Sequence, residues 1–352
     1  MGQVLALRRE AGTPDAEKAR QLVTEHLTAL GYRVEIQRFR FHPSGLLAFP
    51  VFGAGLGGLA LLLLPLLTMP RIAGWGALLV WVTGLAALAV LSAGVALGWL
   101  ALGGGMREDA NLIATRSSAP VRRWIVAHLD TKAQIQSMAG RLVAVWIIGL
   151  AIAALSTLSV FRLWGPLQLG PAGAGAALAI VAGALAGRGR LRGTSPGARD
   201  NGSGLLAALA AAETSSGGGT GVLVTGAEEF GLVGSRVFAR LESSALRNAV
   251  VVNLDTIDAE GDLYLVSHDR RGERLAADTA PAFADLGVTV RARRLPLGIL
   301  VDSLPLARAG ASAITIGRLT WRTLRLIHTP RDTPDGLSFE MAERVGRALG
   351  VN

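Results

Sequence analysis

The chain has 352 residues, of which 51% are hydrophobic, and its mean hydropathy is +0.43. That average is too high for a soluble enzyme of this length. The formal net charge is +9, but no basic patch interleaved with aromatic residues indicates nucleic-acid binding, and a basic membrane protein matches anionic lipid head groups more simply. The absence of cysteine excludes disulfides and thiolate ligands, so any metal must be held by histidines and carboxylates.

The chain opens with two elements of a soluble domain. Residues 1–18 lack the apolar core of a signal peptide. Residues 14–31 place Ala19, Val23 and Leu27 on one face and predict an amphipathic helix. Residues 32–41 alternate between apolar and charged side chains, which predicts a strand with a break of register near Arg38.

Four uncharged blocks predict membrane-spanning helices. The first two give a transmembrane hairpin at about 47–68 and 74–101, each long enough to cross about 30 Å of hydrocarbon. The second two, 142–161 and a short helix at about 172–187, give another hairpin whose small residues suit close packing. A buried helix pair in a soluble core is the alternative for this second hairpin.

The remaining sequence predicts an α/β fold with a mixed, mostly parallel sheet flanked by helices. Strands are expected at 111–115, 124–127, 222–225, 249–254, 263–266, 288–291 and 313–316. Helices are expected at 205–213, 232–242, 273–285, 303–309 and 338–349. Alternation of strands with helices is typical of a partly parallel sheet.

Four crossings put all the soluble pieces on one side of the membrane. Residues 1–45, 106–138 and 189–352 can then form one domain, interrupted by hairpins at 46–105 and 139–188. Basic residues flank the helices mainly on the domain side: Arg38, Arg40, Arg107, Lys132, Arg141, Arg188, Arg190 and Arg192. The opposite turns have only Arg71 and Arg162, so the prediction is a multi-pass protein of the cell's inner or plasma membrane with a cytoplasmic domain.

Chemistry-bearing residues recur near predicted strand ends and turns. His128 and Asp130 follow one strand, Glu228 and Glu229 follow another, and a third ends at Asp255. Asp200 lies in the glycine-rich turn 197–204, and His328 lies in a loop. Strand ends meet at one edge of an open sheet, where ligands bind, and histidine with carboxylate suits Zn²⁺. Asp258 competes with Asp255 for its role, and Asp332 is expected to be a turn residue.

The order of these pieces resembles the M28 family of zinc aminopeptidases. The matching motifs are His-x-Asp, Asp-Asn-x-Ser-Gly, Glu-Glu-x-Gly-x-x-Gly-Ser, Asn-x-Asp and His-Thr-x-x-Asp. The resemblance implies two zinc ions: His128 and Asp255 bind one, Glu229 and His328 bind the other, and Asp200 bridges them. It also implies a cis peptide after Asp200.

The same resemblance implies the catalytic roles. Glu228 is the general base, and Asp130 orients the ring of His128. The expected reaction is hydrolysis of an N-terminal peptide bond, with a peptide as substrate and the lipid bilayer as surroundings. The sequence does not define the oligomeric state.

Two alternatives remain open at this point. One is a glutaminyl-cyclase-like enzyme with one zinc, and the other is a non-catalytic membrane scaffold that keeps the peptidase fold. The family often places a tyrosine near the last histidine to stabilise the oxyanion. Here Ile327 precedes His328, and the tyrosines are Tyr32 and Tyr264, so either that stabilisation comes from elsewhere or the activity is reduced.

Overall fold

A computed structural model describes residues 1–116, 120–215 and 218–351. It divides into two compact units, each built from separate segments of the chain. Unit 1 contains Met1–Phe41, Met106–Ala133 and Gly193–Asn352, and unit 2 contains His42–Gly105 and Gln134–Arg192. The two ends of the second segment of unit 2 meet, since Gln134 pairs with Leu191 and the Ile135 N–H donates to the Arg190 carbonyl.

Unit 1 is built on an eight-stranded sheet with the order β1-β2-β4-β3-β5-β8-β6-β7. The strands are β1 Arg33–Phe41, β2 Arg107–Thr115, β3 Arg123–His128, β4 Thr220–Thr225, β5 Val250–Ile257, β6 Asp262–Ser267, β7 Val290–Arg294 and β8 Ser312–Leu319. The central strands β4, β3, β5 and β8 are parallel. The predicted mixed, mostly parallel sheet is therefore confirmed.

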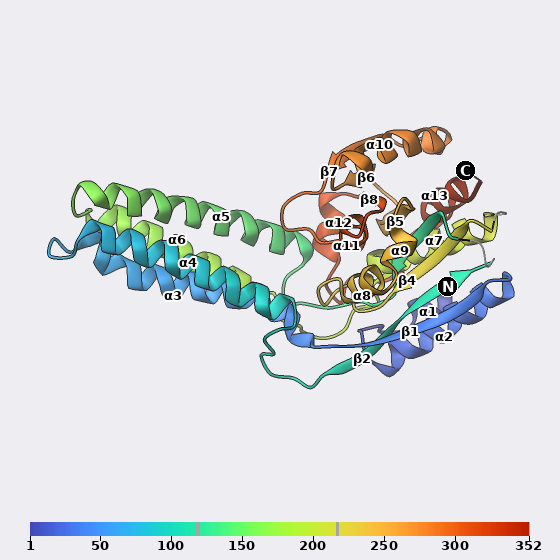
Figure 1. Cartoon of the computed structure of the whole chain (residues 1–352), viewed down its shortest axis with the longest axis horizontal. Coiled ribbons are helices and arrows are strands. Elements are labelled where there is room, and N and C mark those ends of the chain that lie inside the picture. The colour runs from blue at the N-terminus through green and yellow to red at the C-terminus, as the bar shows by residue number, and fades with distance from the viewer. Residues whose placement is uncertain (117–119, 216–217, 352) are drawn as a thin grey trace. The chain divides into compact units, whose positions relative to one another are not determined.

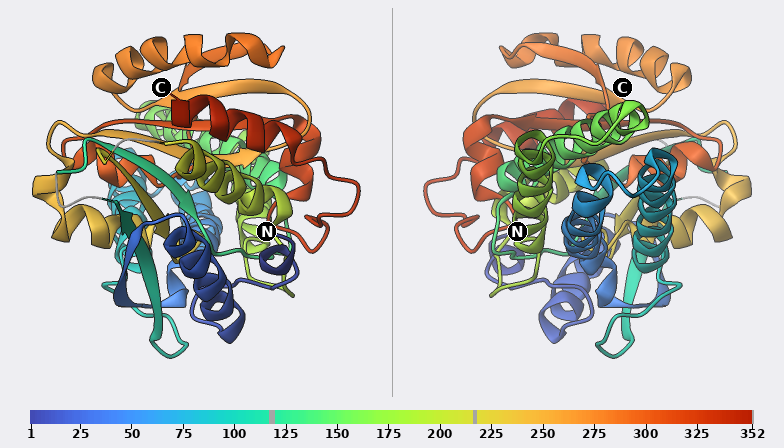
Figure 2. Two further views of the ribbon diagram at one scale, coloured as in Figure 1. Left: turned by 90° about the vertical axis from the view of Figure 1, so that its right-hand side faces the viewer. Right: turned by 90° about the vertical axis from the view of Figure 1, so that its left-hand side faces the viewer.

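Helices cover both faces of this sheet. They are α1 Gly2–Leu5, α2 Pro14–Ala29, α7 Gly204–Thr214, α8 Val233–Leu241, α9 Ser243–Leu246, α10 Arg270–Thr279, α11 Ser303–Arg308, α12 Trp321–Leu326 and α13 Glu340–Val351. On one face α7 and α13 lie side by side over Ile125, Val252 and Ile314 (Figures 1 and 2). On the other face α8 and α11 pack against Trp124 and Val251.

Some predicted elements differ from the structure. The register break near Arg38 is wrong: β1 pairs continuously with β2 from Arg33 to Phe41, with Phe39 and Phe41 buried and Val34 and Ile36 on the other face. The helix predicted at 273–285 is split into α10 and a 3-10 helix, Ala280–Leu286, with a proline near its start. The helices α1, α9 and α12 were not predicted, because they are too short to show helical periodicity.

Unit 2 consists mainly of α3 Ala48–Thr68, α4 Gly74–Ala96, α5 Met138–Phe161 and α6 Leu169–Gly187. These four helices, drawn lengthwise in Figure 1 and seen from their far end in Figure 2 (right), are long and apolar enough to cross a membrane. The predicted end of the second helix at 101 is wrong, because α4 ends at Ala96 and Gly98 adopts positive φ just beyond it. The last helix is longer than predicted, since α6 begins at Leu169 rather than 172.

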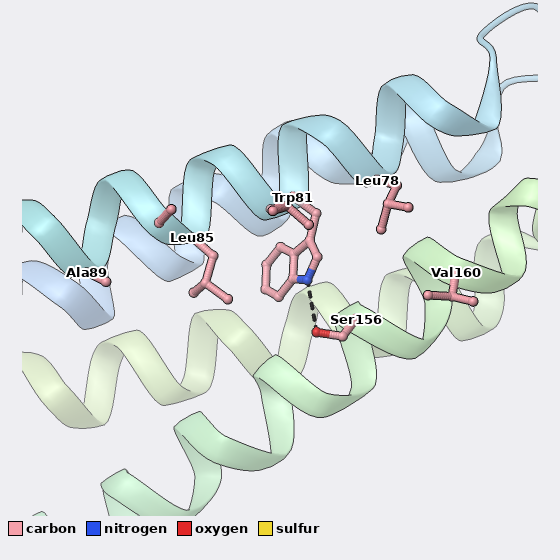
Figure 3. Close-up of a pocket in the computed structure, with 8 residues that line it drawn as sticks. Leu78, Trp81, Leu85, Ala89, Ser156 and Val160 are labelled. Carbon is pink, nitrogen blue, oxygen red and sulfur yellow. Dashed lines mark hydrogen bonds between the residues drawn. The ribbon is translucent and has the colours of Figure 1, made fainter.

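Small residues and one polar contact define the packing of unit 2. A Cβ added at Gly183 of α6 would lie 2.5 Å from the carbonyl oxygen of Gly53 on α3, so these backbones are nearly in contact. Between α4 and α5, apolar side chains line a pocket of about 370 Å³ (Figure 3). There the Trp81 indole N–H donates to the Ser156 hydroxyl at 2.9 Å. Polar side chains pair in this way when hydrocarbon surrounds them.

The close approach of α3 and α6 predicts a position-specific cost. Gly183→Leu should lower the melting temperature of the detergent-purified protein by several degrees, because overpacking costs about 1–3 kcal/mol. Gly173→Leu, on the same helix, is the control, since a Cβ there meets no atom within 4 Å. Equal melting temperatures for the two variants would show that α3 and α6 do not pack through this contact.

Candidate metal centre

The five predicted ligands converge at one edge of the sheet in unit 1. His128 is the last residue of β3, Glu229 lies in the loop after β4, and Asp255 lies near the end of β5. Asp200 comes from the turn before α7, and His328 follows α12. Parallel strands end at the same edge, so segments far apart in sequence supply one site.

The turn that holds Asp200 is fixed by its neighbour Asn201. Helical geometry is interrupted at these two residues, which are joined by the cis peptide that the resemblance implied. The Asn201 amide donates to the Leu254 carbonyl at 2.9 Å, and its side-chain oxygen accepts the N–H groups of Gly204 and Thr256. Asn201 therefore ties the turn to the strand that carries Asp255.

The two carboxylate oxygens of Asp200 face the two histidines. Oδ1 lies 3.2 Å from Nε2 of His128, and Oδ2 lies 3.1 Å from Nε2 of His328. Asp255 Oδ1 is 3.8 Å from the His128 nitrogen, and Glu229 Oε2 is 3.5 Å from the His328 nitrogen. The result is two three-residue groups, His128–Asp200–Asp255 and Asp200–Glu229–His328, that share one carboxylate.

The donor set fits a pair of divalent cations. Within each group the donor atoms lie within 4.8 Å of one another. Two donors of one tetrahedral zinc ion, each about 2.0–2.1 Å from the metal, lie about 3.4 Å apart. Three of the four distances given above are close to that value. Neutral imidazole and carboxylate oxygen are also the donors that zinc uses where no cysteine is present.

Burial gives a second reason to expect cations. Six carboxyl groups lie in or beside the two groups: buried Asp130, Asp200, Glu228, Glu229 and Asp302, and half-buried Asp255. Lys132 lies among them, with Nζ 2.5 Å from Oε2 of Glu229, and the buried guanidinium of Arg9 acts electrostatically on Asp130 and Asp200. Burying charge without compensation is costly, and these two cations leave part of the negative charge to be balanced.

Asp130 holds the site in a way that sequence reasoning did not predict. We expected its carboxylate to orient the ring of His128, but the main-chain carbonyl of Asp130 lies at hydrogen-bond distance, 3.1 Å from Nδ1, and the carboxylate is 3.8 Å away. The carboxylate accepts the N–H groups of Glu228 and Glu229 at 3.0 and 3.1 Å. Burial raises the pKa of Asp130 to about 7.

Glu228 and Glu229 are adjacent but have different surroundings. Glu229 contacts His328 and Lys132. Burial raises the pKa of Glu228 well above its usual range, and the negative charges of Glu229, Asp302 and Asp255 add to this effect, against the opposing influence of His128. A carboxyl group with these properties can hold a proton near neutral pH.

Burial by itself raises the pKa of Asp200, but the net shift of this pKa is downward. The hydrogen bonds and charges of His128 and His328 outweigh the burial and hold the pKa of Asp200 well below its usual range. Asp200 is therefore ionised while the two histidines carry positive charge.

Asp332 lies in a turn, as expected, because its N–H donates to the Thr329 carbonyl at 3.2 Å, but its side chain has a further role. Its side chain is fully buried and accepts the N–H groups of Arg199 and Asp200 at 2.9 and 3.0 Å. Asp258, the competitor of Asp255, instead accepts hydrogen bonds from Arg199 and Thr323 and lies outside both metal-binding groups. The sequence signal for Asp332 was its place in the motif His-Thr-x-x-Asp, four residues after His328.

Neither tyrosine belongs to the two groups. The hydroxyl of Tyr32 donates to the carbonyl of Ala212 at the far end of α7, and Tyr264 lies on β6.

Lys132 was missed as a site residue, because a lysine four positions after a histidine has no distinctive spacing.

One protein-family model matches part of the chain. Residues 186–351 match the model of Peptidase family M28. The match includes Asp200, Glu228, Glu229, Asp255 and His328, and begins after His128. No curated protein sequence matches the chain.

Solved structures share the fold at low sequence identity. A glutaminyl cyclase from Fimbriiglobus ruber has a TM-score of 0.57 and 17% identity, covering 99% of this chain and 90% of its own. An aminopeptidase from Aneurinibacillus sp. strain AM-1 has a TM-score of 0.57 and 16% identity over the same shares. BSAP, a zinc aminopeptidase from Bacillus subtilis, has a TM-score of 0.58 and 16% identity, again over 99% and 90%. At these identities the similarity shows the fold alone.

The Lys132–Glu229 pair predicts a measurable effect on metal binding. Lys132→Met should tighten zinc binding by at least about tenfold, because a buried ammonium group no longer repels the cation. The metal-free variant should also be less stable by about 3 kcal/mol, since Glu229 loses its partner.

Lys18→Met is the control, because Lys18 is exposed. Zinc affinity is measured by competition with a chelator, and stability by melting of the metal-free protein. Weaker zinc binding in Lys132→Met would contradict this account and show that Lys132 mainly positions Glu229.

Proposed function

We propose that this protein is a membrane-bound, zinc-dependent aminopeptidase that hydrolyses N-terminal peptide bonds. One observation carries the proposal: each oxygen of Asp200 faces a different histidine, at 3.2 and 3.1 Å, as a carboxylate shared by two metal ions requires. The match of residues 186–351 to Peptidase family M28 and the similarity of fold to two aminopeptidases support the reaction class.

His128, Asp200 and Asp255 would hold one zinc ion, and Asp200, Glu229 and His328 the other. Bound zinc supplies Lewis acidity, which polarises a peptide carbonyl and lowers the pKa of a water molecule. The protein provides the donor arrangement: the Nδ1 side of His128 faces the Asp130 carbonyl, which leaves Nε2 toward the carboxylates.

Glu228 is the group that moves the proton. It is buried beside the metal-binding groups, and its backbone is fixed by the carboxylate of Asp130. Its carboxylate takes a proton from the attacking water and returns it to the leaving amine, so that the two steps balance. The upward shift of its pKa through burial suits a group that both accepts and donates a proton near neutral pH.

A cyclase-like reaction is the second candidate. The ion pair of Lys132 with Glu229 reduces the negative charge of one metal-binding group, which favours occupation by a single zinc ion. A glutaminyl cyclase is also among the compared structures. The presence of both three-residue groups favours two metal ions and hydrolysis. The complete donor set and the buried Glu228 argue against a non-catalytic scaffold.

We place unit 2 in the membrane on the basis of its exposed surface. Apolar side chains such as Leu62, Leu79 and Leu150 are more than half exposed, which water would disfavour but lipid would not. Trp75 and Trp164, both more than 70% exposed, lie near the two turns that join helices within each hairpin. Tryptophan gathers at membrane interfaces in this way.

The catalytic role of Glu228 predicts loss of turnover without loss of metal. Glu228→Gln should reduce aminopeptidase kcat by about 10²–10⁴-fold, while the zinc content of the purified protein stays unchanged. Glu260→Gln changes an exposed glutamate and should leave both quantities unchanged. Activity is measured with aminoacyl and peptide substrates, and zinc by elemental analysis.

The same samples separate the alternatives. Zinc-loaded wild-type protein that cyclises N-terminal glutamine but hydrolyses no peptide would establish the cyclase instead. Zinc binding without either reaction would leave the scaffold, and a wild-type protein without zinc would refute the site itself.

The membrane topology predicts which positions a thiol reagent reaches. Because the sequence has no cysteine, Arg71→Cys and Arg190→Cys introduce single reactive sites. A membrane-impermeant reagent applied to intact cells should label Cys at 71 only, and both sites after lysis, if the domain is cytoplasmic. Labelling of Cys at 190 alone would reverse the orientation. Labelling of both sites in intact cells would contradict membrane crossing.

A further inference from the structure

Arg9 is a buried arginine that connects the loops carrying the metal-binding residues. It precedes α2 in unit 1, and its side chain is completely buried. Its guanidinium donates to four main-chain carbonyls: Nε to Leu129 at 2.8 Å, Nη1 to Val4 at 3.2 Å and to Pro196 at 2.8 Å, and Nη2 to Gly197 at 3.0 Å.

Three of these carbonyls belong to the loops that hold ligands. Leu129 lies between His128 and Asp130, and Pro196 and Gly197 lead into the turn of Asp200. One planar group therefore fixes the distance between the backbone of the first histidine and that of the shared carboxylate. The rigid fork of arginine suits this task, because several of its donors keep a fixed relative geometry.

The two loops leave little room for adjustment around Arg9. The Thr131 N–H donates to the carbonyl of Arg9 at 3.1 Å, and the Thr131 hydroxyl donates to the Ser195 carbonyl at 3.0 Å. A Cβ on Gly197 would lie 2.2 Å from Cγ2 of Thr131, so the loops touch at this point. A change at Arg9 is thus transmitted to the position of Asp200 relative to His128.

The charge of Arg9 is retained despite its burial. Burial lowers its pKa to about 10, and the nearby charges of Asp332, Asp130 and Asp200 act in the opposite direction. Burying a cation is costly, so the presence of Arg9 here is not explained by stability alone. Its hydrogen bonds to both ligand loops give it a different role.

We propose that Arg9 is a positioning residue for the metal centre. By holding the 129–131 and 195–197 loops together, it sets the zinc affinity of the group formed by His128, Asp200 and Asp255. This inference rests on the metal centre of the proposed function. It assigns to the N-terminal segment a direct part in building the site.

The test uses Arg9→Lys and Arg9→Met in the full-length, detergent-purified protein. Arg9→Lys keeps the charge but loses the fork, so its zinc dissociation constant should rise about tenfold or more, as is typical when a supporting contact is lost. Arg9→Met should weaken binding at least as much. If the charge alone mattered, Arg9→Met would bind zinc more tightly, which would overturn the proposal.

Arg20→Lys is the matched control. Arg20 is also a buried arginine of unit 1, where it donates to the Ala110 carbonyl and pairs with Asp109 and Glu17. It contacts neither ligand loop, so this variant should lose thermal stability while its zinc dissociation constant stays within about twofold of the wild type. Equal zinc affinities in folded Arg9 and Arg20 variants would refute the positioning role.

The results distinguish a failure of the Arg9 proposal from a failure of the proposed function and from misfolding of the variants. If the wild type binds no zinc, the proposed function fails; unchanged zinc affinity in the Arg9 variants beside a zinc-binding wild type refutes Arg9 alone. If both Arg9 variants fail to fold, Thr131→Val removes the other loop-to-loop hydrogen bond and should weaken zinc binding severalfold. An unchanged zinc affinity in that folded variant would count against the proposal.

Discussion

The structure of unit 1 depends on the burial of several carboxylates at one edge of its sheet. Asp200, Glu228 and Glu229 are buried together, and Lys132 alone of the nearby buried residues brings an ammonium group to them. Such a concentration of negative charge is stable only if cations are bound or protons are held. Both responses fit the proposed function, in which the shared carboxylate would bind cations and the buried glutamate would exchange a proton.

The ligands are held mainly through their backbones. Asp332 accepts the N–H of Asp200, Asp130 accepts the N–H groups of both glutamates, and Asn201 joins the Asp200 turn to β5. Arg9 adds a connection between two ligand loops from the first residues of the chain. Side chains that act on backbone groups leave the ligand atoms free to face metal, which is the division of roles expected at a preorganised site.

The sequence was sufficient to predict the parallel sheet, the four apolar helices and the residues that the structure brings together. Strand ends and residue chemistry are local signals that drew attention to His128 and the two glutamates, and the family resemblance then implied which of them are ligands. Arg9 and Lys132 could not be identified in this way, because their roles arise from partners far away in the chain, and the motif that contains Asp332 did not reveal what its carboxylate contacts. The roles that did emerge from sequence were also incomplete: Asp130 was identified, but its carboxylate contacts the backbone of Glu228 and Glu229 rather than the ring of His128.

The central claim is that Asp200 is shared by two metal ions. Anomalous scattering from crystals of the zinc-loaded, full-length protein, recorded on both sides of the zinc absorption edge, tests it most directly. The account predicts two zinc peaks, one on each side of the Asp200 carboxylate, with His128 and Asp255 beside one peak and Glu229 and His328 beside the other. A single peak would contradict the two-metal centre, and peaks that do not contact Asp200 would contradict the assignment of the site.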